Sequence, residues 1–137
     1  MSRRRSSVLL GALLGTALLV TGCGAGGDVE NFVEGRYELV RRTGDSAVYR
    51  SPEPIGTTAG TIAAAVPPVA RQADGAAEYL RYDDDMVVVS GAPTGATVLV
   101  EDLDGRYSSG FYAFLGPGFR PGSPAAGSGG GGPGDVK

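Results

Sequence analysis

Residues 76–105 read AAEYLRYDDDMVVVSGAPTGATVLVEDLDG, and they carry the strongest structural signal in the chain. Three segments rich in aromatic or β-branched residues, 77–82, 85–90 and 96–101, are separated by turn-forming residues. Apolar side chains recur in them at every second position, which is the period of a β-strand. The stretch therefore predicts an antiparallel meander. Met86 to Val89 is apolar throughout, so we place segment 85–90 as the central strand. One face of this strand is expected to pack on a helix, and the other face to be partly covered.

Upstream of the meander, apolar residues at helical spacing predict one main helix. The stripe consists of Ile55, Ala59, Ile62, Ala63 and Val66. Thr57 or Thr58 is a candidate N-cap, and Pro67-Pro68 ends the helix because proline cannot continue the hydrogen-bond ladder.

Shorter elements flank this helix and the meander. Asp28 caps a short helical turn, and extended segments 37–42 and 47–50 form a hairpin about the turn formers at 43–46. A last strand at 107–115 closes the sheet. The fold class is therefore α+β, with one main helix packed on a small antiparallel sheet of three to five strands.

The first 22 residues have the layout of a signal peptide: a basic head, then an uncharged apolar run from 8 to 20. As a helix, this run spans only about 20 Å, short of the hydrocarbon core of a bilayer. It ends in Leu19-Val20-Thr21-Gly22-Cys23, which resembles the lipobox of bacterial lipoproteins. We expect cleavage between Gly22 and Cys23, and a diacyl lipid on Cys23 that holds the chain on the membrane.

Two alternatives remain at this end of the chain. Cleavage by the ordinary secretory route would leave Cys23 as an incidental thiol, although it is the only cysteine. The three arginines at 3–5 raise twin-arginine export, but Ser6-Ser7 follows them where an apolar pair is expected, which favours general secretion.

Composition divides the remaining chain into three parts. Residues 23–27 form a glycine-rich tether, 28–115 form the small α+β domain, and 116–137 contain 13 glycines or prolines in 22 residues. Such a segment has too few apolar groups to offset the entropy of ordering, so we expect a disordered tail. Both termini of the domain are thus predicted to be flexible.

Charge and residue usage exclude several classes of function. Without the leader the chain has 9 basic and 15 acidic residues, a net charge of −6, which disfavours binding to nucleic acid. It contains no histidine and one cysteine, so no Cys/His metal cluster and no intrachain disulfide can form. We expect no cofactor.

The densest polar cluster, the candidate polar patch, consists of Arg81, Tyr82, Asp83, Asp84 and Asp85. At the tip of a hairpin, three aspartates are candidate ligands for a cation or a polyamine, because hard cations and ammonium groups prefer oxygen. A calcium loop needs more acidic positions than 102–105 supplies. The simpler interpretation is that aspartates favour turns through local hydrogen bonds and solvation, and we assign no metal ligand.

The sequence contains few residues that could take part in catalysis. A serine assisted by lysine is excluded in practice, because the only lysine is Lys137 at the end of the chain. Paired carboxylates from 83–85 and from Asp102 or Asp104 are the remaining route, as in glycoside hydrolysis, but no tryptophan is present to stack a sugar. We expect no enzymatic activity and assign no catalytic residue.

Several short motifs resemble an actinobacterial lipoprotein family of unknown function, domain of unknown function 4247. They are VTGC at 20–23, YRSP at 49–52, YLRYDDD at 79–85 followed by VVV at 87–89, and the glycine-rich end. The resemblance implies a small secreted lipoprotein with no assigned activity. Genes of the family often neighbour those of small membrane proteins and of a polyamine-forming enzyme, which implies a membrane-protein partner.

The function predicted is that of a membrane-anchored extracytoplasmic lipoprotein, a non-enzymatic binding or accessory module for another envelope component. The first alternative is a binder of cations or polyamines through Asp83 to Asp85. The second is a weak hydrolase that uses carboxylates.

Overall fold

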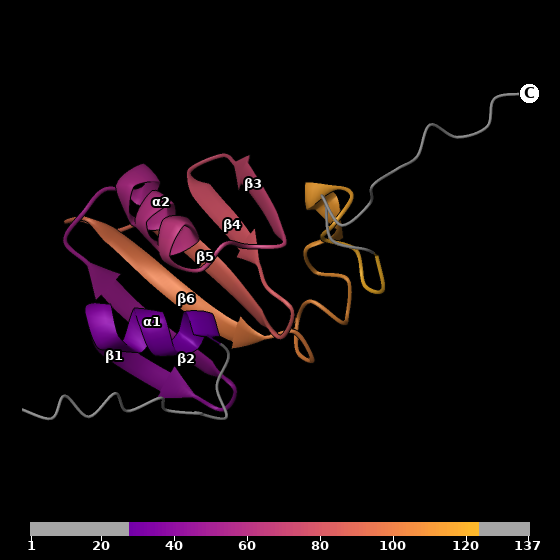
Figure 1. Ribbon diagram of the computed structural model, residues 1–137, viewed down its shortest axis with the longest axis horizontal. Coiled ribbons are helices and arrows are strands. Elements are labelled where there is room, and N and C mark those ends of the chain that lie inside the picture. The colour runs from indigo at the N-terminus through magenta and orange to yellow at the C-terminus, as the bar shows by residue number, and fades with distance from the viewer. Residues whose placement is uncertain (1–27, 124–137) are drawn as a thin grey trace, which may run out of the picture.

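The computed structural model describes residues 28–123. Six strands form one antiparallel sheet, and two helices lie on one of its faces (Figure 1). The elements are α1 (Asp28–Arg36), β1 (Glu38–Thr43), β2 (Ser46–Ser51), α2 (Ile55–Ala65), β3 (Ala70–Asp74), β4 (Ala77–Arg81), β5 (Asp85–Gly91), β6 (Ala96–Asp102) and the 3-10 helix η1 (Ala113–Leu115).

The strands follow the order β1-β2-β6-β5-β4-β3. Strands β4, β5 and β6 form the predicted meander, β3 extends it at one edge, and the β1–β2 hairpin joins it by pairing β2 with β6. The predicted interior position of 85–90 is confirmed, because β5 lies between β4 and β6. Strands β1 and β3 form the two edges of the sheet.

The predicted fold class is wrong in its proportions, because the protein is mostly sheet. Instead of one main helix on three to five strands, two short helices cover a six-stranded sheet. Strand β3 was not predicted. It is an edge strand in which every residue after Ala70 is exposed, so its sequence shows no alternation of apolar residues. Helix α1 is a full element, because Val29 and Val33 are buried and Arg42 of β1 forms an ion pair with Glu30 at 2.9 Å.

Residues 103–123, here called the C-terminal lobe, correct two further expectations. The strand predicted at 107–115 is wrong, because Gly110 has φ +83° and the segment folds into turns and η1. The disordered tail predicted from 116 does not begin there, since the Phe119 side chain is only 2% exposed. The predicted tail beyond 123, the signal peptide and the tether at 23–27 lie outside the described residues.

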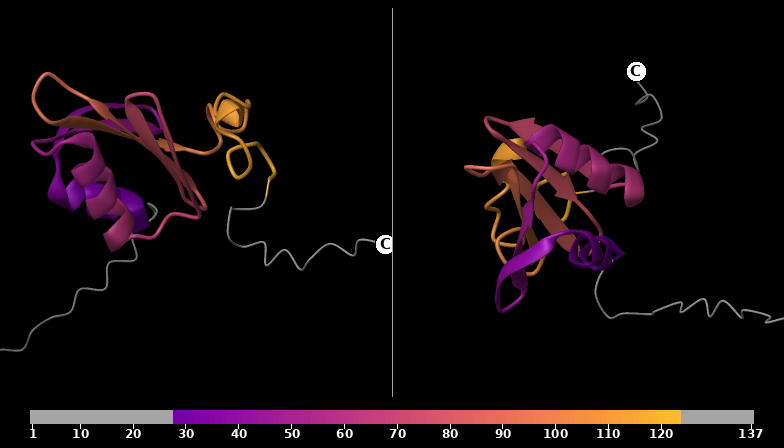
Figure 2. Two further views of the ribbon diagram at one scale, coloured as in Figure 1. Left: turned by 90° about the horizontal axis from the view of Figure 1, so that it is seen from above. Right: turned by 90° about the vertical axis from the view of Figure 1, so that its left-hand side faces the viewer.

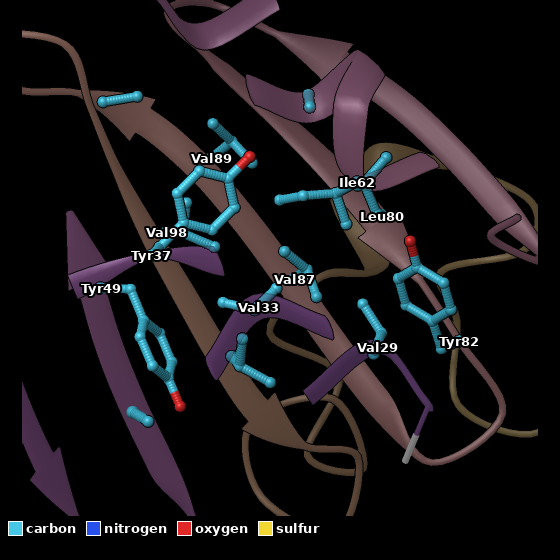
Figure 3. Close-up of a cluster of buried hydrophobic side chains, with 14 residues drawn as sticks. Val29, Val33, Tyr37, Tyr49, Ile62, Leu80, Tyr82, Val87, Val89 and Val98 are labelled. Atoms are coloured by element: carbon cyan, nitrogen blue, oxygen red, sulfur yellow. The ribbon is translucent and has the colours of Figure 1, made fainter. Parts of the chain in front are cut away.

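The larger core fills the space between the helices and the sheet. Side chains from α1 and α2 meet strand side chains there, as Figure 3 shows for Val29, Val33 and Ile62 above Val87 and Val89. These five side chains are almost fully buried. This packing holds the α2 stripe on the sheet even though the helix has no side-chain N-cap.

A second core lies on the opposite face of the sheet, under the C-terminal lobe. Figure 2 shows the helices on one side of the sheet and the lobe beyond the other. The lobe contributes Tyr107, Tyr112, Leu115 and Phe119, which pack with Met86 of β5. The strand side chains in this core come from β3, β4 and β5, with Val88 at its border, and no residue in 28–123 covers the β1–β2–β6 part in this way.

Candidate functional site

The uncovered part of the sheet forms a groove of about 610 Å³, here called the sheet groove. Its floor is an in-register row of aliphatic side chains, in which Leu99 of β6 pairs with Val48 of β2 and with Val88 of β5. Arg41 of β1 continues the row beyond Val48. The full lining is Arg41, Thr43, Ser46, Val48, Val88, Ser90, Thr97, Leu99, Glu101 and Arg106.

Strand alternation explains why the floor is apolar. Ala47 and Tyr49 point into the core beneath the helices, so Val48 between them points to the opposite face. Leu99 lies in the same way between the buried Val98 and Val100. Strands β2 and β6 thus carry apolar side chains on both faces, although only the helix side is sealed.

One wall of the sheet groove comes from the C-terminal lobe. Arg106 forms an ion pair with Glu101 at 2.8 Å and lies over the Phe111 ring, with 4.8 Å between the guanidinium carbon and the ring centroid. Tyr112 donates a hydrogen bond to the same carboxylate. The hydrogen bond to Glu101 raises the pKa of Arg106, and burial raises the pKa of Tyr112, so the arginine stays charged and the tyrosine stays neutral.

The sheet groove therefore has a positive character. Among residues 28–123, Glu101 is the only carboxylate in its lining, and that charge is already compensated by Arg106. Arg41 forms no ion pair with any residue in 28–123. Its guanidinium is thus available to a bound carboxylate, as is the half-exposed face of Arg106.

The candidate polar patch does not form one surface. Arg81 lies under the C-terminal lobe, where its Nη1 donates to the carbonyl oxygens of Gly118 at 2.5 Å and Ser123 at 3.1 Å. The neighbouring Tyr82 lies on the helix side and donates from its hydroxyl to the carbonyl of Val66 at 2.9 Å. Adjacent strand residues point to opposite faces, so Arg81 and Tyr82 hold the two layers to the sheet.

The three aspartates do lie at the tip of the β4–β5 hairpin, as predicted, but in unequal surroundings. Asp83 and Asp84 are exposed, whereas Asp85 is only 7% exposed and its Oδ2 has no hydrogen-bond partner within residues 28–123. They line a pocket of about 320 Å³, here called the aspartate pocket, together with Asp28 and apolar side chains including Val29.

Electrostatics set Asp85 apart from its neighbours. Burial, followed by the nearby charges of Glu30, Asp102 and Asp84, raises the pKa of Asp85 to about 6. Asp102 lies directly opposite Asp85 in the β5–β6 pairing, so the two acidic segments that the sequence offered as a pair do meet. Within 28–123, however, no three acidic side chains are arranged to hold a metal ion.

Comparison with known proteins places the chain in a family. The family model described as "Domain of unknown function (DUF4247)" matches residues 16–131. The chain belongs to this family. Similar proteins are the uncharacterised proteins of two Mycobacterium tuberculosis strains, CDC 1551 / Oshkosh and ATCC 25618 / H37Rv. Each is 37% identical over 132 residues, which cover 91% of this chain and 90% of the relative. No solved structure matches the chain.

The predicted membership of this family of unknown function is thus confirmed, and the relatives are actinobacterial, as expected. The sheet groove was not predicted. A signal for it was present, because Val48 and Leu99 break the alternation of apolar and polar residues expected of a sheet with one solvated face. No helix in residues 28–123 is long and apolar enough to cross a membrane.

Asp85→Asn is expected to stabilise the protein at neutral pH. Because the pKa of Asp85 is raised from 3.8 to about 6, the folded state binds its proton more tightly, and stability falls as the pH rises from about 4 through about 6. Asparagine removes this cost, so the free energy of unfolding should increase by about 2 to 3 kcal/mol at pH 7 and by little below pH 4. Urea denaturation across this pH range measures both.

The exposed neighbour Asp83 supplies the matched control, and Asp83→Asn should change stability little at either pH. Equal stability of the wild type and Asp85→Asn at pH 7 would show that the buried carboxyl carries no such cost.

Proposed function

We propose that this protein is a membrane-anchored, extracytoplasmic and non-enzymatic module that holds another envelope component in its sheet groove. The observation that carries the proposal is the groove itself, an aliphatic floor left uncovered beside the part of the same face that the C-terminal lobe covers. Uncovered apolar area rimmed by polar groups is typical of an interaction site.

The sequence at 19–23 supports anchoring, because it places a cysteine directly after a signal-peptide layout. The tether at 23–27 leads into α1, which lies on the side of the sheet opposite the groove. The described domain therefore begins on the side of the sheet away from the sheet groove, which leaves the groove open to a partner.

The groove chemistry supports binding rather than catalysis. Its lining offers hydroxyls, aliphatic side chains and two arginines, and its one carboxylate, Glu101, already accepts from Tyr112 and Arg106. General acid or base catalysis needs a group free to exchange a proton with the substrate. A groove of this composition holds a ligand in place without such a group.

In-cell photocrosslinking tests the groove as the binding surface. A photoreactive residue at position 99, on the groove floor, should give a defined crosslinked species in membranes of the native host. The same residue at position 64, exposed on α2 on the other side of the sheet, is the control and should give none. Equal crosslinking from both positions, or none from 99, would contradict the proposal.

A second candidate, cation or polyamine binding, is favoured by one observation: the buried Oδ2 of Asp85 has no hydrogen-bond partner among residues 28–123, and Asp85 lines the aspartate pocket with Asp83 and Asp84. A bound cation would supply that partner. Calorimetric titration with Ca²⁺ and with putrescine tests it, since binding should weaken as the pH falls through about 6. Heat that persists in a variant with all three aspartates changed to asparagine would exclude this pocket.

A further inference from the structure

We infer that the sheet groove binds an extended segment of a partner protein in which aliphatic side chains at alternate positions are flanked by carboxylates. The inference rests on the proposed function and specifies the chemistry of the partner. It is carried by the register of the groove floor, by the charge of the rim and by the hydroxyl groups between them.

The floor sets the spacing of the apolar side chains. Val48, Leu99 and Val88 lie side by side on adjacent strands, and strands are spaced by about 4.8 Å, so the row is about 10 Å long. An extended chain advances about 3.3 Å per residue and turns every second side chain to the same face. Two aliphatic residues at positions i and i+2 therefore fit along the row.

The rim sets the charge of the segment. Arg41 stands in register at one end of the row and has no ion-pair partner within 28–123, while Arg106 projects from the lobe wall. Residues 28–123 hold 8 arginines against 14 acidic residues, so two arginines with a single, compensated carboxylate form a local exception. Carboxylates beside the aliphatic residues would complete ion pairs with these guanidiniums.

The hydroxyl groups favour a peptide over an acyl chain. Four serine and threonine side chains line the groove: Thr43, Ser46, Ser90 and Thr97. Ser46 already donates to the Thr43 carbonyl oxygen at 3.0 Å. An extended peptide offers backbone N–H and C=O groups to the other hydroxyls, whereas a hydrocarbon chain would cover them at a cost of about 1 to 3 kcal/mol for each one left without a partner. At the rim, Phe111 is 54% exposed beside Arg106 and adds apolar area for the flanks of the segment.

Three fluorescent ten-residue peptides test the inference against the full-length chain purified in detergent. The first carries two valines at alternate positions flanked by glutamates, the second has lysines in place of the glutamates, and the third has serines in place of the valines. Fluorescence anisotropy should show binding of the first peptide only. Arg41→Glu should weaken that binding at least tenfold, because the end of the row then repels the carboxylate.

Arg120→Glu is the matched control, since Arg120 is exposed, lies outside the groove lining and undergoes the same change of charge. Leu99→Ser should abolish binding by removing the centre of the floor, and circular dichroism checks that each variant is folded. Equal binding of the lysine peptide, or an Arg41→Glu variant that binds as well as wild type, would overturn the inference.

Dodecanoate tests the alternative ligand, an acyl chain. Binding of dodecanoate at the groove without binding of the acidic peptide would overturn the inference and assign the groove to an acyl chain. If position 99 still crosslinks to a partner in membranes while the acidic peptide fails to bind, the proposed function stands and this partner chemistry is wrong. If position 99 does not crosslink and the acidic peptide does not bind, both the proposed function and this partner chemistry are wrong.

Discussion

Replacing Gly95 with alanine is expected to lower the free energy of unfolding by about 4 kcal/mol or more. Gly95 lies in the β5–β6 turn with φ +79°, a conformation that costs an L side chain energy. A Cβ there would stand 2.1 Å from the carbonyl oxygen of Ser51 and 2.8 Å from the carbonyl carbon of Pro52. Both are backbone atoms, so no side-chain rotation relieves the collision.

Gly75→Ala separates the collision from the conformational strain. Gly75 has a positive φ of 56° in the β3–β4 turn, but nothing lies within 4 Å of the position of its Cβ. Gly75→Ala should lower the free energy of unfolding by only about 1 to 2 kcal/mol. Urea denaturation measures the change for both variants. Equal losses for the two variants would show that the contact with Ser51 is not a constraint.

The consequence of Gly95→Ala extends to the sheet groove. Ser51 is the last residue of β2 and pairs with Ala96, the first residue of β6. A displaced turn therefore disturbs the junction between the β1–β2 hairpin and the meander. Because Val48 and Leu99 pair across this junction, the groove floor should be lost together with stability.

Phe119→Ala is expected to cost about 3 to 5 kcal/mol, because it removes a large side chain that is only 2% exposed in the second core. Phe119 lies on the segment whose carbonyl groups receive the Arg81 hydrogen bonds. Its loss should release the C-terminal lobe from the sheet. Urea denaturation gives the stability change, and amide exchange in 103–123 reports whether the lobe opens.

Phe114→Ala is the matched control from the same lobe, because Phe114 is 60% exposed and meets the Tyr79 ring in a T-shaped contact, with 6.0 Å between the ring centroids. It should cost less than about 1.5 kcal/mol. If Phe119→Ala is as mild as this control, the lobe does not depend on its buried phenylalanine, and the second core does not hold the Arg106 wall of the sheet groove in place.

The sequence predicts the inner strands well because their signal is local. In 77–101, period-two apolar residues and turn formers agree, so the three strands appear where expected. The α2 stripe succeeds for the same reason. Edge strand β3 was not predicted, because Ala70 is its only buried residue and gives no period-two pattern. Its position depends on pairing with β4.

The C-terminal lobe escapes prediction for a different reason. Its glycines and serines indicate turns, but nothing local reveals that Phe119 joins the core that contains Met86 of β5. Arg81, likewise, adjoins the acidic cluster in sequence, whereas its partners are backbone carbonyls at Gly118 and Ser123. Contacts across 37 and 42 residues carry no periodic signal in the chain.

The candidate site was predicted in part. The position of three aspartates at a hairpin tip follows from strand pattern alone, but the burial that sets Asp85 apart requires α1 and β6 beside it. The sheet groove requires knowing which half of a face the lobe leaves open. Apolar residues on both faces of β2 and β6 were the local clue, since a strand with one solvated face would alternate with polar residues.

Anchoring through Cys23 is the central claim of the proposed function, and the intact mass of the native protein tests it most directly. Wild-type protein extracted from membranes and a Cys23→Ala variant should be compared by mass and by partition between membrane and soluble fractions. The proposal predicts a mature chain that begins at Cys23 with a diacyl lipid, and a variant without the lipid that leaves the membrane. A soluble wild-type chain with a free thiol at Cys23 would contradict it.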